Sequence, residues 1–364
     1  MNGMPALGAG LIGRTLAAIA ALALLCSACA PQRAAPESAK PAPGQAAAPA
    51  GQPAAGAPAM SLKFSHILAK DTPKGKGADK FAELVKQKSG GRIEVQVYPN
   101  SELYKDAEEL EALQNGAIQF IAPSPDKFGS LAPEWDAVAL PYLWTSDAAA
   151  NKFMTPGNPL AQELLESLRP KGFLGLAVWG LGWKHFTNSK HPIKTPADFQ
   201  GLKIRTSGKP DEALVKAMGG SATVMAFSEL FGALQQGVVD GQYTPWANNY
   251  TSKFYEVQKY ATISRGGAYV VYAVATNARW WDSLDADSRQ ILSDAMNEAS
   301  AYQVTLSDKD NADSLEAIKQ SGKVEFYEQT QEDARLFEQA AQPVIAEWEA
   351  KTGKDIIQKL KALN

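Results

Sequence analysis

Residues 196–260 decide the fold and function predicted for this chain, and they read PADFQGLKIRTSGKPDEALVKAMGGSATVMAFSELFGALQQGVVDGQYTPWANNYTSKFYEVQKY. A turn over Pro196–Gly201 leads into a short apolar strand, Leu202–Ile204, and Arg205 follows directly. A guanidinium group binds a carboxylate through two parallel N–H donors, which a lysine cannot reproduce. Because this stretch carries no evident nucleophile, base or metal-ligand cluster, it is predicted to bind an anion rather than to transform one.

Alternating strands and helices surround this stretch on both sides. A sheet built from such a pattern binds its ligand beyond the carboxyl ends of its strands. Two such patterns predict an α/β fold of two domains with a cleft between them. The predicted elements are strands at 62–67, 92–98 and 117–122 with helices at 76–89 and 107–115, then strands at 202–204 and 222–226 with helices at 210–218 and 228–236.

A long polar segment is expected to join the two domains. Residues 286–320 contain neither proline nor glycine, and one helix over them would span about 50 Å and cross both domains. The alternative is a pair of helices with a break near Ser307–Asp308; we favour the single helix. We therefore predict a first domain from 61–184 with about 274–313, and a second from 185–273 with about 314–364.

The first 60 residues have the composition of a targeting segment and a tether. Thr15–Leu25 is an apolar run of eleven residues, too short to span a bilayer and typical of a signal peptide. Small residues precede Cys29, so residues 1–29 resemble a bacterial lipoprotein signal ending at a lipidated Cys29; export with cleavage nearby is the alternative. Residues 30–60, rich in Ala and Pro, predict a disordered tether on the periplasmic or extracytoplasmic side.

Composition excludes several classes of protein. The net charge of −3 and the absence of a basic run argue against a nucleic-acid partner. Both cysteines, Cys26 and Cys29, precede residue 30, which excludes disulfides and thiolate chemistry from the rest of the chain. The three histidines have no metal-ligand spacing. We therefore expect no metal, no cofactor and no catalytic residues.

Seven segments, taken in order, resemble one family. From Leu62 to the C-terminus the chain is similar to the extracytoplasmic solute-binding subunits of TRAP (tripartite ATP-independent periplasmic) transporters, the DctP family. The resemblance implies two α/β domains, joined by a hinge and a long helix, that close around an organic acid. The segments are residues 91–103 (GRIEVQVYPNSEL), 140–143 (LPYL), 186–193 (FTNSKHPI), 201–205 (GLKIR), 226–230 (AFSEL), 233–242 (ALQQGVVDGQ) and 254–259 (FYEVQK).

The resemblance also assigns roles to individual residues. It implies that Arg205 binds the carboxylate, that Phe227 packs near the ligand, that Lys184 is a second basic residue and that Ser124 lines the pocket. The chain departs from the family pattern Glu-Asn-Pro at Tyr243-Thr244-Pro245. Thr244 can donate one hydrogen bond but lacks the amide of the family's asparagine.

Aromatic residues cluster near these segments and are further ligand-binding candidates. Trp183, Tyr243 and Trp246 would offer apolar contact and ring stacking, and burial in the core is the alternative for each. If they line the site, we expect a compact acid with an apolar or ring-like body rather than a small, polar dicarboxylate.

The leading hypothesis is therefore a transport protein rather than an enzyme. It would capture an organic acid through the Arg205 clamp and deliver it to the small and large membrane subunits, as a monomer that touches the membrane only through its lipid anchor. The alternative is a sensory receptor on the same fold that feeds a signalling partner. An exported hydrolase or lyase is a third possibility, without a GxSxG motif, paired metal motif or Cys–His pair to support it.

Overall fold

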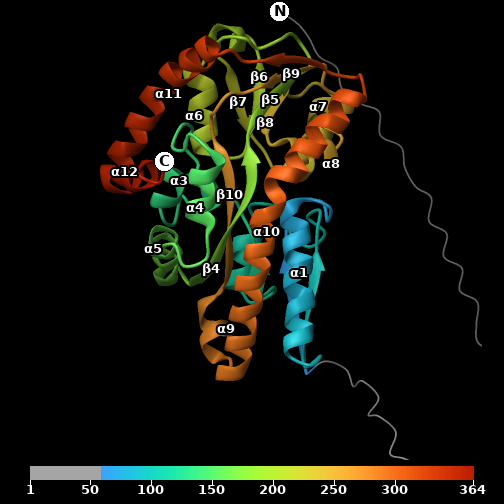
Figure 1. Cartoon of the computed structure of the whole chain (residues 1–364), viewed down its shortest axis with the longest axis vertical. Helices are drawn as coiled ribbons and strands as arrows, with labels where there is room; N and C mark the ends of the chain where they lie inside the picture. The colour runs from blue at the N-terminus through green and yellow to red at the C-terminus, as the bar shows by residue number, and fades with distance from the viewer. Residues whose placement is uncertain (1–58) are drawn as a thin grey trace, which may run out of the picture. The chain divides into compact units, whose positions relative to one another are not determined.

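Two mixed β-sheets organise residues 59–364, the part of the chain described by a computed structural model (Figure 1). The predicted signal peptide, Cys29 and nearly all of the tether lie outside these residues. The first sheet has the strand order β2-β1-β3-β10-β4, in which β1, β2 and β3 are parallel and β10 is antiparallel to its neighbours β3 and β4. Its strands are β1 (Met60–Ser65), β2 (Ile93–Tyr98), β3 (Phe120–Ile121), β4 (Phe173–Trp183) and β10 (Tyr269–Asn277).

The second sheet has the strand order β11-β9-β5-β8-β6-β7. The strand that carries Arg205, β6, lies between β7 and β8 and is parallel to both, so the three carboxyl ends meet at one edge. This edge is where a doubly wound sheet presents a ligand site. The strands are β5 (His185–Asn188), β6 (Lys203–Thr206), β7 (Ser221–Val224), β8 (Gly241–Thr244), β9 (Tyr260–Ile263) and β11 (Glu325–Glu328).

The helices begin and end largely where the sequence signals place them. In α1 (Pro73–Lys88), the side chain of Thr72 accepts the N–H of Gly75 at 3.2 Å, and Pro73 occupies the first turn. The predicted start at residue 76 was three residues late because this first turn lacks the apolar periodicity. The other α-helices are α2 (Glu109–Gln114), α3 (Glu134–Val138), α4 (Asp147–Met154), α5 (Pro159–Ser167), α6 (Lys209–Ala217), α7 (Leu230–Gln235), α8 (Trp246–Thr251), α9 (Ala278–Ser283), α10 (Ala286–Gln320), α11 (Gln331–Thr352) and α12 (Lys354–Lys361).

The long helix is confirmed as a single element. Helix α10 contains 35 residues and packs on α1 and β4 of the first sheet and on α8 beside the second (Figure 1). The suggested break near Ser307 does not occur. The hydroxyl of Ser307 instead donates to the carbonyl of Gly180 at 3.0 Å, and the amide of Gln303 accepts the N–H of Gly180 at 3.0 Å. The polar residues in the middle of α10 therefore bind the backbone of β4.

The chain passes between the sheets at two glycine-containing junctions. Gly182 precedes the step from β4 to β5 and has a φ of +128°, while Gly266 and Gly267 precede β10 with φ of +84° and +117°. Residues with side chains rarely adopt such angles. A Cβ on Gly182 would also lie 2.6 Å from Nδ2 of Asn311. Both junctions therefore require glycine, and they lie where the chain passes between the sheets.

The division into domains with the boundaries given above stays a prediction. The return predicted near residue 274 falls inside β10, which pairs with β4 from Tyr269 onward. The C-terminal helix α12 packs on α3 and shares its apolar core with β4 and β10. Among residues 59–364, no helix combines the length and apolar character needed to cross a bilayer.

Candidate ligand-binding site

Arg205 is buried at the carboxyl end of β6 and held by the backbone. Its side chain is 4% exposed, and its Nε and Nη2 donate to the carbonyl of Met225 at 3.1 and 2.8 Å. The guanidinium carbon lies 5.7 Å from the ring centroid of Phe227. Burial lowers the pKa of Arg205 and the nearby Asp106 opposes that shift; an arginine nevertheless stays charged in proteins. The sequence thus places a fixed, desolvated cation at the sheet edge.

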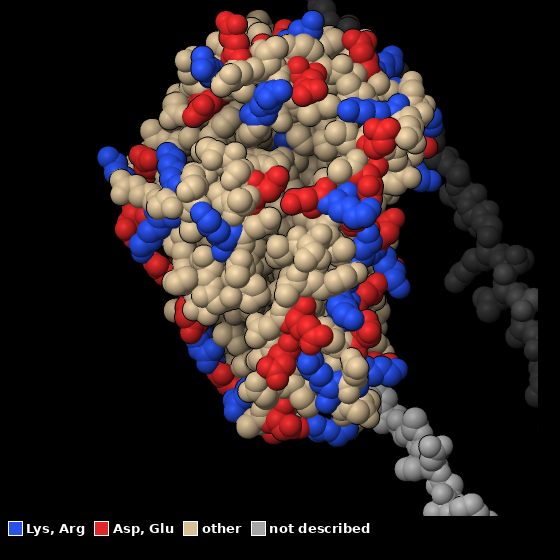
Figure 2. All heavy atoms as spheres, viewed as in Figure 1, with Lys and Arg blue, Asp and Glu red and all other residues tan. Residues whose placement is uncertain are grey.

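A small cavity of about 40 Å³ adjoins Arg205, and segments following strands of both sheets contribute to its wall. Six of the predicted ligand-binding residues meet there: Arg205, Lys184, Phe227, Thr244, Tyr243 and Ser124. The remaining lining residues are Ile67, Leu68, Asp106, Ser207, Asn248, Val270 and Tyr272. On the face of the molecule shown in Figure 2, basic and acidic side chains are interspersed, whereas the cavity wall brings buried charges together.

Trp183 and Trp246 do not line this cavity. Trp183 is the last residue of β4, and its indole nitrogen donates to Asp147 at 2.6 Å. Trp246, the first residue of α8, stacks on His185 with ring centroids 4.5 Å apart and is 4% exposed. The alternative of burial in the core therefore describes Trp246, and of the three aromatic candidates Tyr243 alone lines the cavity.

Lys184 reaches the cavity but is already paired. Its Nζ lies 2.6 Å from Oδ2 of Asp211, and the same oxygen accepts the hydroxyl of Ser207 at 2.9 Å. Both charged side chains are almost fully buried. Removing one partner of such a pair leaves the other charge buried and unpaired. Lys184 therefore forms part of the cavity wall, and Asp211 neutralises its charge.

Asn248 is a cavity residue that the sequence reasoning missed. Its Nδ2 donates to the hydroxyl of Thr244 at 3.1 Å, and its Oδ1 is buried with no hydrogen-bond partner among the described residues. It supplies an amide beside Thr244, where the departure from the family pattern led us to expect none. Asn248 is the third residue of α8, close behind the segment Tyr243-Thr244-Pro245, and this nearness in sequence is the signal that could have revealed it.

A second buried cation lies on the side of the first sheet. The ammonium of Lys74 sits 3.8 Å from the ring centroid of the cavity residue Tyr272 and donates to the carbonyl of Ala122 at 3.0 Å. Glu109 accepts the hydroxyl of Ser65 at 3.0 Å. Burial lowers the pKa of Lys74 and raises that of Glu109, and the attraction between the two groups opposes both shifts.

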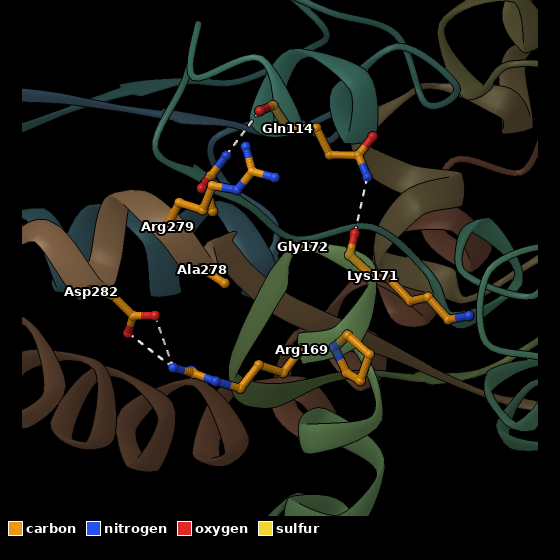
Figure 3. A pocket seen from close by; sticks show the side chains of 9 residues that line it. Gln114, Arg169, Lys171, Gly172, Ala278, Arg279 and Asp282 are labelled. Atoms are coloured by element: carbon orange, nitrogen blue, oxygen red, sulfur yellow. Dashed lines mark hydrogen bonds and ion pairs between the residues drawn. The ribbon is translucent and has the colours of Figure 1, made fainter.

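A larger cavity, of about 490 Å³, lies at the other end of the first sheet (Figure 3). Arg169 on its wall already binds both carboxylate oxygens of Asp282, at 2.9 and 3.0 Å, and Gln114 donates to the carbonyl of Lys171 at 3.1 Å. Arg169, Lys171 and Arg279 are exposed to solvent, where ionic contacts contribute little. The buried cavity at Arg205 is therefore the better candidate for specific recognition.

Comparison with known proteins identifies the class. The model of the family described as bacterial extracellular solute-binding protein, family 7 (DctP) matches residues 64–352. A C4-dicarboxylate-binding periplasmic protein DctP of Rhodobacter capsulatus is 45% identical over 303 residues, which cover 83% of this chain and 90% of the relative. A C4-dicarboxylate-binding protein DctB of Bacillus subtilis is 39% identical over 302 residues, covering 83% and 85%.

A solved structure shows the same fold. A TRAP periplasmic solute-binding protein from Shewanella oneidensis with bound succinate superposes with a TM-score of 0.81 at 36% identity, covering 85% of this chain and 100% of the other. This chain belongs to the DctP family of extracellular solute-binding proteins. The fold is the two-domain, periplasmic-binding-protein-like α/β fold that the resemblance implied.

Proposed function

We propose that this protein captures a C4-dicarboxylate outside the cytoplasm and delivers it to the small and large membrane subunits of a TRAP transporter. The observation that carries the proposal is a pair of buried cations, Arg205 beside the second sheet and Lys74 behind Tyr272 on the first. Arg205 would bind one carboxylate directly, whereas Lys74, which does not line the cavity, would favour a second one only through its charge. The names of the two relatives and the succinate in the Shewanella structure support the same ligand class.

Capture requires the cleft to open and close. The cavity beside Arg205 is small, about 40 Å³, and its wall comes from segments of both sheets, so a dicarboxylate has to enter and leave it through an opening of the cleft. We assign the hinge to the junctions at Gly182 and at Gly266–Gly267, where the chain passes between the sheets. A ligand that contacts both sheets would then stabilise the closed arrangement.

Two measurements on the purified domain from Ser61 onward test this function. Calorimetric titration should show saturable binding of succinate, malate or fumarate, in preference to aromatic or branched monocarboxylates. Small-angle scattering should show a smaller radius of gyration at saturating succinate than without it. A preference for the aromatic monocarboxylates would contradict the ligand class, and a scattering profile unchanged by a bound ligand would contradict hinge closure.

We also propose that Cys29 is lipidated and that residues 30–60 tether a monomeric domain to the membrane. The apolar run followed by Ser27, Ala28 and Cys29 supports this assignment. Cys29→Ser should release the full-length protein into the soluble extracytoplasmic fraction, whereas Cys26→Ser should leave it with the membranes. Equal membrane association of the Cys29→Ser protein and its parent would rule out the anchor.

A further inference from the structure

Asp106 is an acidic side chain on a wall that is otherwise suited to anions. It lies in the loop between β2 and α2, is 4% exposed, and is the one carboxylate among the described residues that line the cavity. Both of its oxygens accept the backbone N–H of Phe227 at 3.3 Å. Its Oδ2 also lies 4.0 Å from Nη2 of Arg205. Asp106 thus connects a loop of the first sheet to the arginine of the second.

The position of Asp106 matters because some of the N–H donors of Arg205 already bind the protein backbone. The Nε–Nη2 side of the guanidinium faces the carbonyl of Met225. A ligand carboxylate would therefore have to use the remaining edge, formed by Nη1 and Nη2. Asp106 is close to the Nη2 end of that edge, so two carboxylates would meet there at short range, where like charges repel strongly in a buried site.

A second contact crosses the same gap from the neighbouring residue. The ammonium of Lys105 lies 2.8 Å from Oε1 of Glu229, in the 3₁₀ turn Phe227–Glu229. Both of these side chains are about half exposed, and an ion pair of this kind contributes little. The pair offers a matched control, because it joins the same loop to the same turn without touching Arg205.

We propose that Asp106 is an internal competitor for Arg205, which a ligand carboxylate must displace before the cleft can close around it. Without ligand, part of the population has an open cleft that admits a dicarboxylate, and in the remainder Asp106 draws its loop onto the turn at Phe227 and occupies the approach to Arg205. This inference rests on the proposed function in that the ligand is taken to be a carboxylate. Asp106 thereby lowers the affinity for the ligand. The apparent dissociation constant equals the intrinsic constant divided by the fraction of molecules in a binding-competent conformation, and Asp106 reduces that fraction.

The test is Asp106→Asn, which keeps an oxygen acceptor for the Phe227 N–H and removes the charge. Without ligand, its radius of gyration should exceed that of the parent. In calorimetric titration it should bind succinate about tenfold more tightly, a change of the size expected from removing one buried like charge. Glu229→Gln, which breaks only the exposed pair, should change neither quantity measurably.

Each outcome decides the inference. Unchanged or weaker succinate binding by Asp106→Asn, or ligand-free scattering equal to that of the parent, would overturn it. If that variant fails to fold, as judged by circular dichroism, Asp106→Ser is measured in the same way. If the parent binds none of the dicarboxylates, the proposed ligand class fails separately, and the ligand-free scattering of the variant still decides whether Asp106 holds the cleft.

Discussion

Arg205→Lys is expected to weaken succinate binding by roughly ten- to a hundredfold, the equivalent of one charged hydrogen bond of about 1.5–3 kcal/mol. A lysine keeps the positive charge but cannot bind the Met225 carbonyl and a ligand carboxylate from two edges of one rigid plane. The residue is 4% exposed, so water cannot replace the lost donors. Calorimetric titration of the variant and its parent measures the difference directly.

A matched control lies on the same strand. Lys203 is exposed, two residues before Arg205 on β6, so Lys203→Gln changes the net charge without reaching the cavity. Its affinity for succinate should equal that of the parent. If Arg205→Lys also binds as the parent does while remaining folded, the carboxylate clamp at Arg205 is refuted.

Trp179→Ala is expected to lower the free energy of unfolding by about 3–5 kcal/mol, the range for truncating a fully buried aromatic residue. Trp179 is 0% exposed, its ring lies 5.9 Å from that of Phe64, and its Nε1 donates to the hydroxyl of Ser300 on α10 at 2.8 Å. The substitution would leave a void between the first sheet and the long helix. Denaturation in urea, followed by circular dichroism, gives the value.

Two further variants separate the causes of that loss. Trp179→Phe keeps much of the ring volume and removes the hydrogen bond, so its cost should be intermediate. Tyr302→Ala removes an aromatic side chain of α10 that is 40% exposed, and it should change stability by less than about 0.5 kcal/mol. A loss for Trp179→Ala no larger than that of Tyr302→Ala would show that α10 is not held through this contact.

Local signals predicted most of the elements of the fold. Strict alternation gave β2, and an uninterrupted run without proline or glycine gave α10, including its first and last residues. The domain boundary near residue 274 stays a prediction, and β10 itself was not predicted, because an apolar strand of nine residues carries no mark of the sheet it joins. Strand partners depend on tertiary packing, which a local pattern does not encode.

The candidate site was predicted in part. Arg205 and Phe227 belong to recognisable segments, and the structure brings them to one cavity. Asp106 and Lys74 were missed because they come from segments that are distant in sequence and meet the second sheet, or its cavity, only after folding. Trp183 was misplaced because proximity in sequence to Lys184 does not decide where a side chain points: Lys184 lines the cavity, whereas Trp183 binds Asp147.

The hydrogen bonds between the middle of α10 and β4 determine which part of the long helix can move relative to the first sheet. They fix the helix at Gln303, Ser307 and Asn311, whose side chain donates to the carbonyl of Leu181, so the remaining nine residues to Gln320 form a lever about 14 Å long that reaches the second sheet. A bend of 20° at its base would move its tip by about 5 Å. Spectroscopic labels at the two ends of this lever would therefore report cleft motion with amplification, and the chain has no native thiol beyond Cys29 to interfere with their attachment.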